Sequence, residues 1–141
     1  MIGRNRNLLL PPEPPEPVRE SFFFRFSPTD LETSLSVTGV FRPTSIGSNV
    51  EGFDGATLTR FTVGGREQLV GTIPLGALHA HGVGFPHALR DLWKLSGVES
   101  GLSLLLPTIA RLQPLVLACT DLTREVEIYL DGWYLPQEGR P

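Results

Sequence analysis

Residues 124–135 read Arg-Glu-Val-Glu-Ile-Tyr-Leu-Asp-Gly-Trp-Tyr-Leu and carry the clearest structural signal in the sequence. Polar and apolar side chains alternate through residues 124–130, which is the period of a strand with one buried face. Asp131-Gly132 is a dipeptide typical of a type I′ turn between two strands. We therefore predict a β-hairpin that turns at this dipeptide and returns along residues 133–135.

Strand signals also occur in the first third of the chain. Phenylalanine occupies four of the six positions in residues 21–26, and a turn is predicted at residues 28–30. Residues 35–41 are predicted to form a second strand that ends before Pro43. Residues 44–55 are rich in Ser, Gly, Asn and Asp without a sustained period, so we predict a loop there.

A second hairpin is predicted within residues 57–70, where two glycines separate two apolar runs. A two-residue loop at residues 64–65 would place Phe61 opposite Gln68. A loop longer by one residue would place Phe61 opposite Leu69. We favour the longer loop because it pairs two apolar side chains across the strands.

One short α-helix is predicted at about residues 86–96. Pro86 suits the first helical position, Gly97 suits the residue after the helix, and Leu89 and Leu92 share one face. A helix of this length is unstable alone, so we expect it to pack on the sheet.

These signals together predict a mainly β fold in a chain of 141 residues. We expect residues 21–141 to form a single domain, either a β-sandwich or a small β-barrel of about seven or eight strands with the one short helix. Residues 1–20 are predicted to precede this domain as an extended arm.

The arm is predicted from its prolines. Residues 11–17 hold five of the 13 prolines in the chain, and such a run favours the extended polyproline II conformation. This stiff segment would hold the apolar residues 8–10 roughly 20 Å from the domain. A geometry of this kind suits an arm that reaches a neighbouring molecule, although chain ends often fray.

Composition and charge exclude several classes of partner. The net charge of −3 gives no cationic field for a phosphate backbone, so we expect no nucleic acid partner. The single cysteine, Cys119, lies in an apolar run and is expected to be a buried hydrophobic residue. The sequence contains no nucleophile elbow, Walker loop or dinucleotide-binding glycine motif, so we expect neither an enzyme nor a cofactor.

Membrane and secretion signals are also weak. The apolar run at residues 102–118 is interrupted by two prolines and an arginine, so we expect no membrane helix. The apolar residues 8–10 stop at Pro11, short of the core of a signal peptide. We therefore expect synthesis in the cytoplasm without signal-peptide secretion.

Three histidines within nine residues form the one cluster of metal-ligating side chains. His79 and His81 would share one face of a strand, and His87 or Asp91 would add a third ligand for Zn²⁺ or Fe²⁺. The alternative, a surface loop that leads into the helix, explains the same residues. We favour the loop and keep the metal site as a second hypothesis.

The function that we expect is that of a non-catalytic structural subunit of a larger assembly, namely a virion protein such as a phage capsid decoration or tail protein. Its partners would be copies of itself or another structural protein, reached through the arm and the sheet edges. The alternatives are a metal-binding protein or metalloenzyme that uses the histidines, and an interaction module whose proline-rich tail is the ligand of another domain. The residues predicted to bind a partner are Leu8, Leu9, Leu10, Pro11, Pro12, Pro14, Pro15, Phe22, Phe24, Trp133 and Tyr134.

Overall fold

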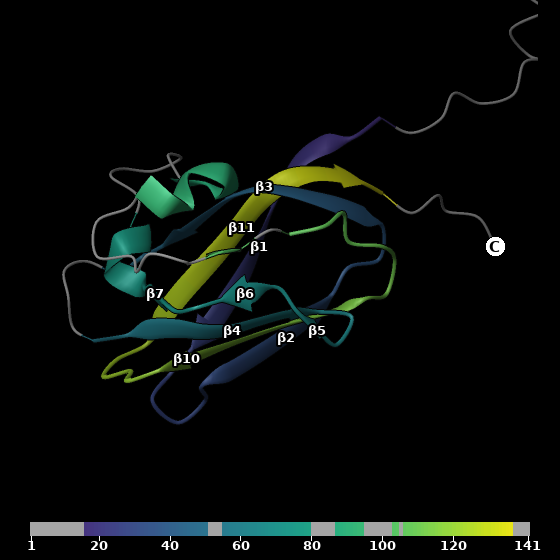
Figure 1. Ribbon diagram of the computed structural model, residues 1–141. Coiled ribbons are helices and arrows are strands. Elements are labelled where there is room, and N and C mark those ends of the chain that lie inside the picture. The colour runs from purple at the N-terminus through teal and green to yellow at the C-terminus, as the bar shows by residue number, and fades with distance from the viewer. Residues whose placement is uncertain (1–15, 51–54, 80–86, 95–102, 105, 137–141) are drawn as a thin grey trace, which may run out of the picture.

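The computed structural model describes residues 16–50, 55–79, 87–94, 103–104 and 106–136. Two antiparallel sheets face each other across one apolar core, which confirms the predicted mainly β class and gives a β-sandwich (Figure 1). The elements are β1 (Val18–Phe26), β2 (Glu32–Ser36), β3 (Val40–Ser48), β4 (Thr57–Val63), β5 (Arg66–Glu67), β6 (Leu69–Val70), β7 (Ile73–Pro74), the 3-10 helix η1 (Leu75–Leu78), β8 (His87–Ala88), the 3-10 helix η2 (Leu89–Lys94), β9 (Ser103–Leu104), β10 (Pro114–Thr120) and β11 (Val126–Leu135).

The first sheet has the strand order β1-β11-β3-β8. Strand β11 lies between β1 and β3 and is antiparallel to both. Figure 1 shows β1 in purple beside β11 in yellow, so segments far apart in sequence lie side by side. Strand β1 is the edge of this sheet, with β11 as its one neighbour among the described strands.

The second sheet has the order β2-β10-β4-β5, with β7 also paired to β4. Strands β6 and β9 form a separate two-stranded ladder. The core between the sheets takes the inward side chains of the long strands, which alternate with outward ones. Among the fully buried side chains are Phe24, Phe41, Ile46, Leu58, Phe61, Leu115, Leu117 and Ile128.

The predicted hairpin at Asp131-Gly132 is wrong, because β11 runs straight through this dipeptide to Leu135. The dipeptide instead causes an irregularity within the sheet, because the register of β11 with β3 shifts between Asp131 and Gly132. A Cβ built on Gly132 would lie 2.1 Å from the carbonyl oxygen of Arg42. Glycine is therefore needed here for a close approach of two backbones, and not for a turn.

The predicted strand at residues 35–41 is wrong, because β2 ends at Ser36 and β3 begins at Val40 in the other sheet. The predicted strand end at Pro43 and the predicted loop at residues 44–55 are also wrong in part, because β3 continues to Ser48. Pro43 is tolerated inside β3 since it lies opposite Gly132, where the register shifts and a missing N–H costs little. The small residues that follow it suit a strand whose side chains are buried: Ser45 and Ser48 are at most 8% exposed.

The glycine hairpin forms with the shorter of the two loops considered, so the favoured register was wrong. Val63 pairs with Arg66, and Gly64 and Gly65 have φ angles of 59° and 82°. Positive φ at both loop residues gives the type I′ turn, whose twist matches that of the strands. Leu69 is buried by pairing with Leu104 of β9 and not with Phe61.

The predicted α-helix at residues 86–96 is replaced, in its described part, by a short strand and a 3-10 helix. His87 and Ala88 pair with β3, and η2 follows over Leu89–Lys94. Pairing with the sheet gives these two residues backbone hydrogen bonds that the first turn of a helix would leave unmade. The apolar face itself was predicted correctly, since Leu92 is 2% exposed.

Two further predictions are confirmed. Cys119 is 1% exposed in β10, as expected for a small hydrophobic residue. Ser27 and Asp30 exchange two backbone hydrogen bonds of 3.0 and 2.9 Å, which closes the predicted turn after β1. Within the described chain, no helix is long and apolar enough to cross a bilayer. Most of the predicted arm lies outside the described residues, and its last three residues, 18–20, belong to β1.

Candidate functional site

The outward side of β1 and β11 is the surface that stands out, and we call it the outer face. Alternation along β1 sends Phe24 and Phe26 into the core and leaves the odd-numbered side chains on the opposite side. Each of them lies directly across from a side chain of β11. The outer face consists of Arg19, Ser21, Phe23 and Arg25 with Trp133, Asp131, Tyr129 and Glu127.

The four cross-strand pairs of the outer face differ in chemistry. Arg25 Nε donates to Glu127 Oε2 at 2.9 Å, and the hydroxyl of Ser21 donates to Asp131. The rings of Phe23 and Tyr129 have centroids 6.2 Å apart. The guanidinium carbon of Arg19 lies 5.0 Å from the ring centroid of Trp133, within cation–π range.

Large apolar side chains remain exposed at this surface. Phe23 is 57% exposed and Trp133 is 43% exposed. Val40, at the start of the neighbouring strand β3, is 38% exposed. Aromatic side chains exposed together on one face of a sheet are a common mark of an interaction surface.

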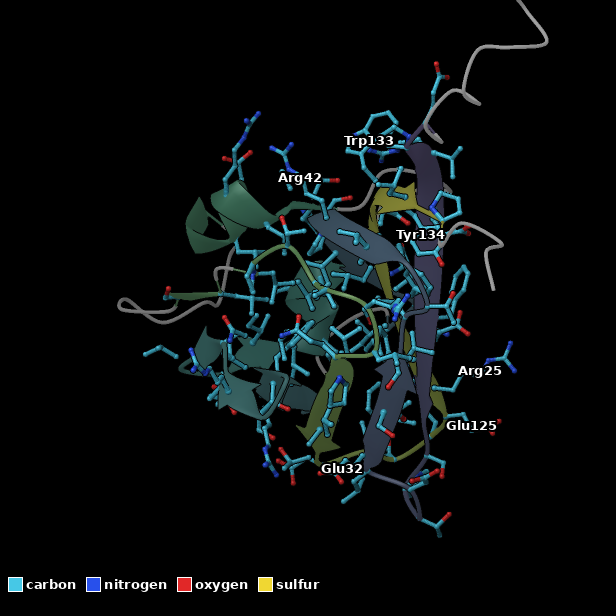
Figure 2. All side chains as sticks on the ribbon, turned by 90° about the vertical axis from the view of Figure 1, so that its right-hand side faces the viewer. Arg25, Glu32, Arg42, Glu125, Trp133 and Tyr134 are labelled. Atoms are coloured by element: carbon cyan, nitrogen blue, oxygen red, sulfur yellow. The ribbon has the colours of Figure 1, made fainter. Side chains whose placement is uncertain are left out.

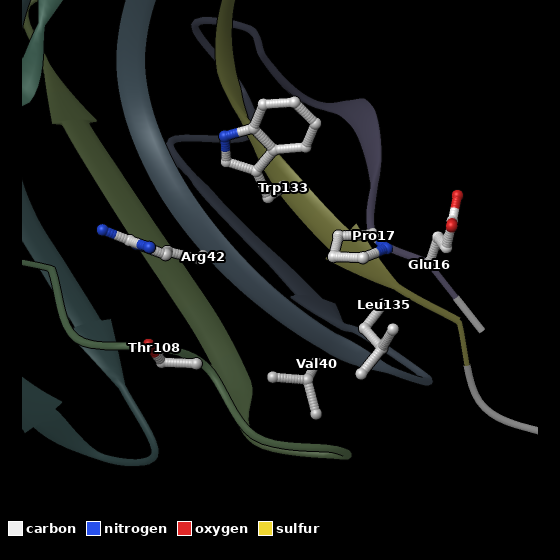
Figure 3. Close-up of a pocket in the computed structure, with 7 residues that line it drawn as sticks. All are labelled: Glu16, Pro17, Val40, Arg42, Thr108, Trp133 and Leu135. Atoms are coloured by element: carbon white, nitrogen blue, oxygen red, sulfur yellow. The ribbon is translucent and has the colours of Figure 1, made fainter. Parts of the chain in front are cut away.

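A groove of about 710 Å³ opens at the end of the outer face, beside Trp133. Figure 3 shows its seven lining residues around the hollow, contributed by the segment before β1, by β3, by β11 and by the chain between β9 and β10. The lining residues are Glu16, Pro17, Val40, Arg42, Thr108, Trp133 and Leu135.

The charge around the groove is mixed and asymmetric. Arg42 lines it from β3, and Arg19 lies against the indole of Trp133. Glu16 is the acidic residue of the lining. Figure 2 shows Trp133 and Arg42 at the end of the molecule where β1 begins, away from Arg25 and Glu125.

Farther along the outer face, Tyr129 lies between two carboxylates. Burial raises the pKa of its phenol, and the negative charges of Asp131 and Glu127 raise it further. The phenol therefore stays protonated at neutral pH and remains a hydrogen-bond donor.

The structure separates the residues predicted to bind a partner into groups. Trp133 is exposed on the outer face, as a partner-binding residue requires. Phe22 and Tyr134 are half-buried, and their rings are 5.8 Å apart between centroids. Phe24 is fully buried, so the prediction that it binds a partner is corrected: its side chain belongs to the core. The predicted residues Leu8, Leu9, Leu10, Pro11, Pro12, Pro14 and Pro15 lie outside the described residues.

Sequence reasoning missed Phe23, Tyr129 and Arg42 as surface residues of this site. The alternation of residues 21–26 could have identified Phe23, because a strand that buries Phe24 must turn Phe23 outward. No local pattern marks Arg42, since its place beside Trp133 depends on the pairing of β3 with β11.

The histidine cluster is only partly described. His87 Nε2 lies 3.2 Å from the backbone oxygen of His79, so this ring nitrogen is directed at a carbonyl group. His81 lies outside the described residues. In the parts of the chain that the structure covers, no three His, Cys, Asp or Glu side chains come close enough together to hold a metal ion.

Comparison with known protein families, with curated proteins and with solved structures finds no match for this chain. The outer face and its groove are therefore interpreted from their own geometry and chemistry.

Proposed function

We propose that this protein is a non-catalytic structural subunit that binds a second copy of itself through the outer face. The observation that carries the proposal is the exposure of Phe23 and Trp133 on one side of an edge strand and its neighbour. Burying such aromatic side chains against another protein releases water from their surface and stabilises the complex.

The composition of the outer face supports a protein partner. Protein interfaces are enriched in aromatic residues and arginine and poor in lysine. The outer face carries Phe23, Tyr129 and Trp133 together with Arg19 and Arg25, and it carries no lysine.

The edge of the first sheet gives further support. Strand β1 is nine residues long and has no proline or lysine within it. Residues of these types commonly protect an edge strand from pairing with other chains. Arg19, Glu20 and Arg25 give this edge charge, but its length and the exposed aromatic face beside it suit a protein that assembles through its sheet.

The setting that we propose for this assembly is a virion, as a decoration or tail protein. A small β-rich subunit with a proline-rich N-terminal segment supports this setting by its form. A surface for protein contacts also fits such a subunit better than it fits a metalloenzyme built on the histidines.

The test is the mass of the full chain in solution, measured by light scattering over a range of concentrations. We expect the mass to rise with concentration and the association to weaken in Phe23→Ser. Val70→Ser is the matched control, because Val70 is 62% exposed on β6 and lies off the outer face. A mass that stays that of one chain at every concentration contradicts the proposal.

A further inference from the structure

The groove beside Trp133 has walls of several kinds, and its acidic residue, Glu16, lies beside Pro17 on the side away from Arg42 (Figure 3). Trp133 supplies an indole that Arg19 holds in place from one side, at 5.0 Å from the ring centroid. Val40 and Leu135 supply aliphatic surface, and Arg42 supplies a positive charge (Figure 3). Arg42 is exposed and forms no ion pair with any residue that the structure describes.

These walls define the ligand that suits the groove. Aromatic grooves bind proline-rich peptides, because a polyproline II helix is already extended and its pyrrolidine rings pack on an indole at little entropic cost. A guanidinium at the rim selects a peptide that also carries a carboxylate. The groove therefore fits an acidic, proline-rich segment.

The chain contains such a segment next to the strand that borders the groove. Residues 11–15 read Pro-Pro-Glu-Pro-Pro, with Glu13 at the centre. We propose that residues 11–15 of one copy bind the groove of a second copy, with prolines packed on Trp133 and Glu13 paired with Arg42. This inference rests on the proposed function, because it identifies the contact through which the copies bind.

The occupant comes from a second copy because of where the segment leaves its own domain. Glu16 and Pro17 line the groove of their own chain, and the proline-rich segment is joined to them in the sequence. To fold back over the groove of its own chain, the segment would need a tight bend within a run of prolines. A residue before proline is restricted to extended conformations, which disfavours that bend. At about 3 Å per residue, an extended segment of five residues would span roughly 15 Å beyond Glu16.

Exchange of the segments gives a closed dimer. Each copy would donate residues 11–15 and receive those of its partner, so the same contact forms twice about a two-fold axis. The two contacts support each other, because the second forms within a complex that the first already holds together.

The test is a charge reversal in the full chain, read by sedimentation equilibrium. Arg42→Glu and Glu13→Arg should each weaken dimer formation about tenfold or more, because each reversal affects both contacts. The double variant Arg42→Glu, Glu13→Arg should dimerise within about threefold of the original protein. Arg66→Glu, an exposed arginine on β5 in the other sheet, is the matched control and should change nothing.

A mixing experiment shows that the contact joins two chains. Trp133→Ala removes the groove wall, and replacing Pro12, Pro14 and Pro15 with glycine removes the stiffness of the segment. Neither variant should dimerise alone, whereas an equal mixture should form a dimer that contains one of each chain. The mixture retains one intact groove and one intact segment.

Three outcomes would overturn the inference. Dimers that survive Arg42→Glu and Trp133→Ala would show a different contact, and the proposed assembly function would stand. An indole N–H signal of Trp133 that moves in Glu13→Arg but not with protein concentration would place the segment in the groove of its own chain. A chain that never associates would overturn both the inference and the proposed function.

Discussion

The phenol ring of Tyr129 lies against the backbone of Gly47 on the outer side of the first sheet. The two residues are directly opposite each other on β11 and β3. A Cβ built on Gly47 would lie 2.4 Å from Cε2 of the ring. On its other side the ring contacts Phe23 of β1, so Tyr129 links all three long strands of this sheet.

Gly47→Ala should therefore destabilise the protein by about 1–3 kcal/mol, because the ring must move and gives up its contact with Phe23. The measurement is the free energy of unfolding in urea. In the background Tyr129→Ala the same substitution should cost at least about 1 kcal/mol less, since nothing then occupies the space. An equal cost in both backgrounds would show that the ring is not the cause.

Gly132→Ala should cost more than Gly47→Ala, about 3 kcal/mol or more, because its Cβ meets backbone and not a movable ring. The obstructing atom is the carbonyl oxygen of Arg42, at 2.1 Å. Gly65→Ala is the comparison: nothing lies within 4 Å, and only the φ of +82° is unfavourable. Its expected cost is about 1–2 kcal/mol. Thermal or urea unfolding that ranks Gly65→Ala above Gly132→Ala would contradict the register shift.

Phe24→Ala should lower the free energy of unfolding much more than Phe23→Ala does, although the two residues are neighbours. Phe24 is fully buried, and its loss should destabilise the protein by about 3–5 kcal/mol. Phe23 is 57% exposed, and its loss should cost less than about 1 kcal/mol, the worth of a cross-strand pair. Urea unfolding of both variants checks which face of β1 is inward, and similar costs would refute the assignment.

Stability should decrease at alkaline pH, partly through Cys119. Burial raises the pKa of this thiol from 9.0 to about 12 in the folded protein. Between these values the unfolded chain loses the proton while the folded chain keeps it, so the contribution of the thiol is complete below pH 9 and is lost as pH rises toward 12. The raised pKa of Tyr129 acts in the same direction above pH 10.

The measurement is the free energy of unfolding between pH 8 and pH 11 for the original protein and for Cys119→Ala. The variant should be less stable at pH 8, because it leaves a small cavity, but its stability should decrease less steeply with pH. Parallel curves would show that the thiol does not contribute.

The sequence predicts the fold class because the alternation of inward and outward side chains in the long strands is visible in the sequence itself. Residues 22–26 alternate about a buried Phe24, and the same period marks residues 126–130. Two neighbouring glycines also locate the hairpin after β4. These signals depend on residues within one strand or one turn, which is what a sequence displays directly.

Where the local sequence pattern predicted the wrong structure, pairing with strands distant in the sequence determined the structure that forms. Asp131-Gly132 favours a turn by an amount on the order of 1 kcal/mol, whereas β11 pairs with a strand on each side through this dipeptide. The segment at His87 and Ala88 likewise takes its structure from the edge of β3. Partners more than 40 residues away leave no mark in the local sequence.

The candidate site, like the fold, could be predicted only in part from the sequence. Trp133 was predicted as a partner-binding residue, and the proline-rich segment can be read from the sequence. The groove could not be expected, because Val40, Arg42 and Leu135 meet only through the register of β3 with β11.

The pairing of β1 with β11 also has a consequence during synthesis, because β1 cannot join its sheet until β11 has been made. Ser21 and Asp131, which are bonded to each other across these strands, are 110 residues apart. At the usual rate of translation, about 5–20 s pass between the synthesis of the first and that of the second. Throughout this interval the phenylalanine-rich strand has no neighbour in its sheet. Until β11 has been made, this strand is exposed to aggregation that a chaperone would prevent.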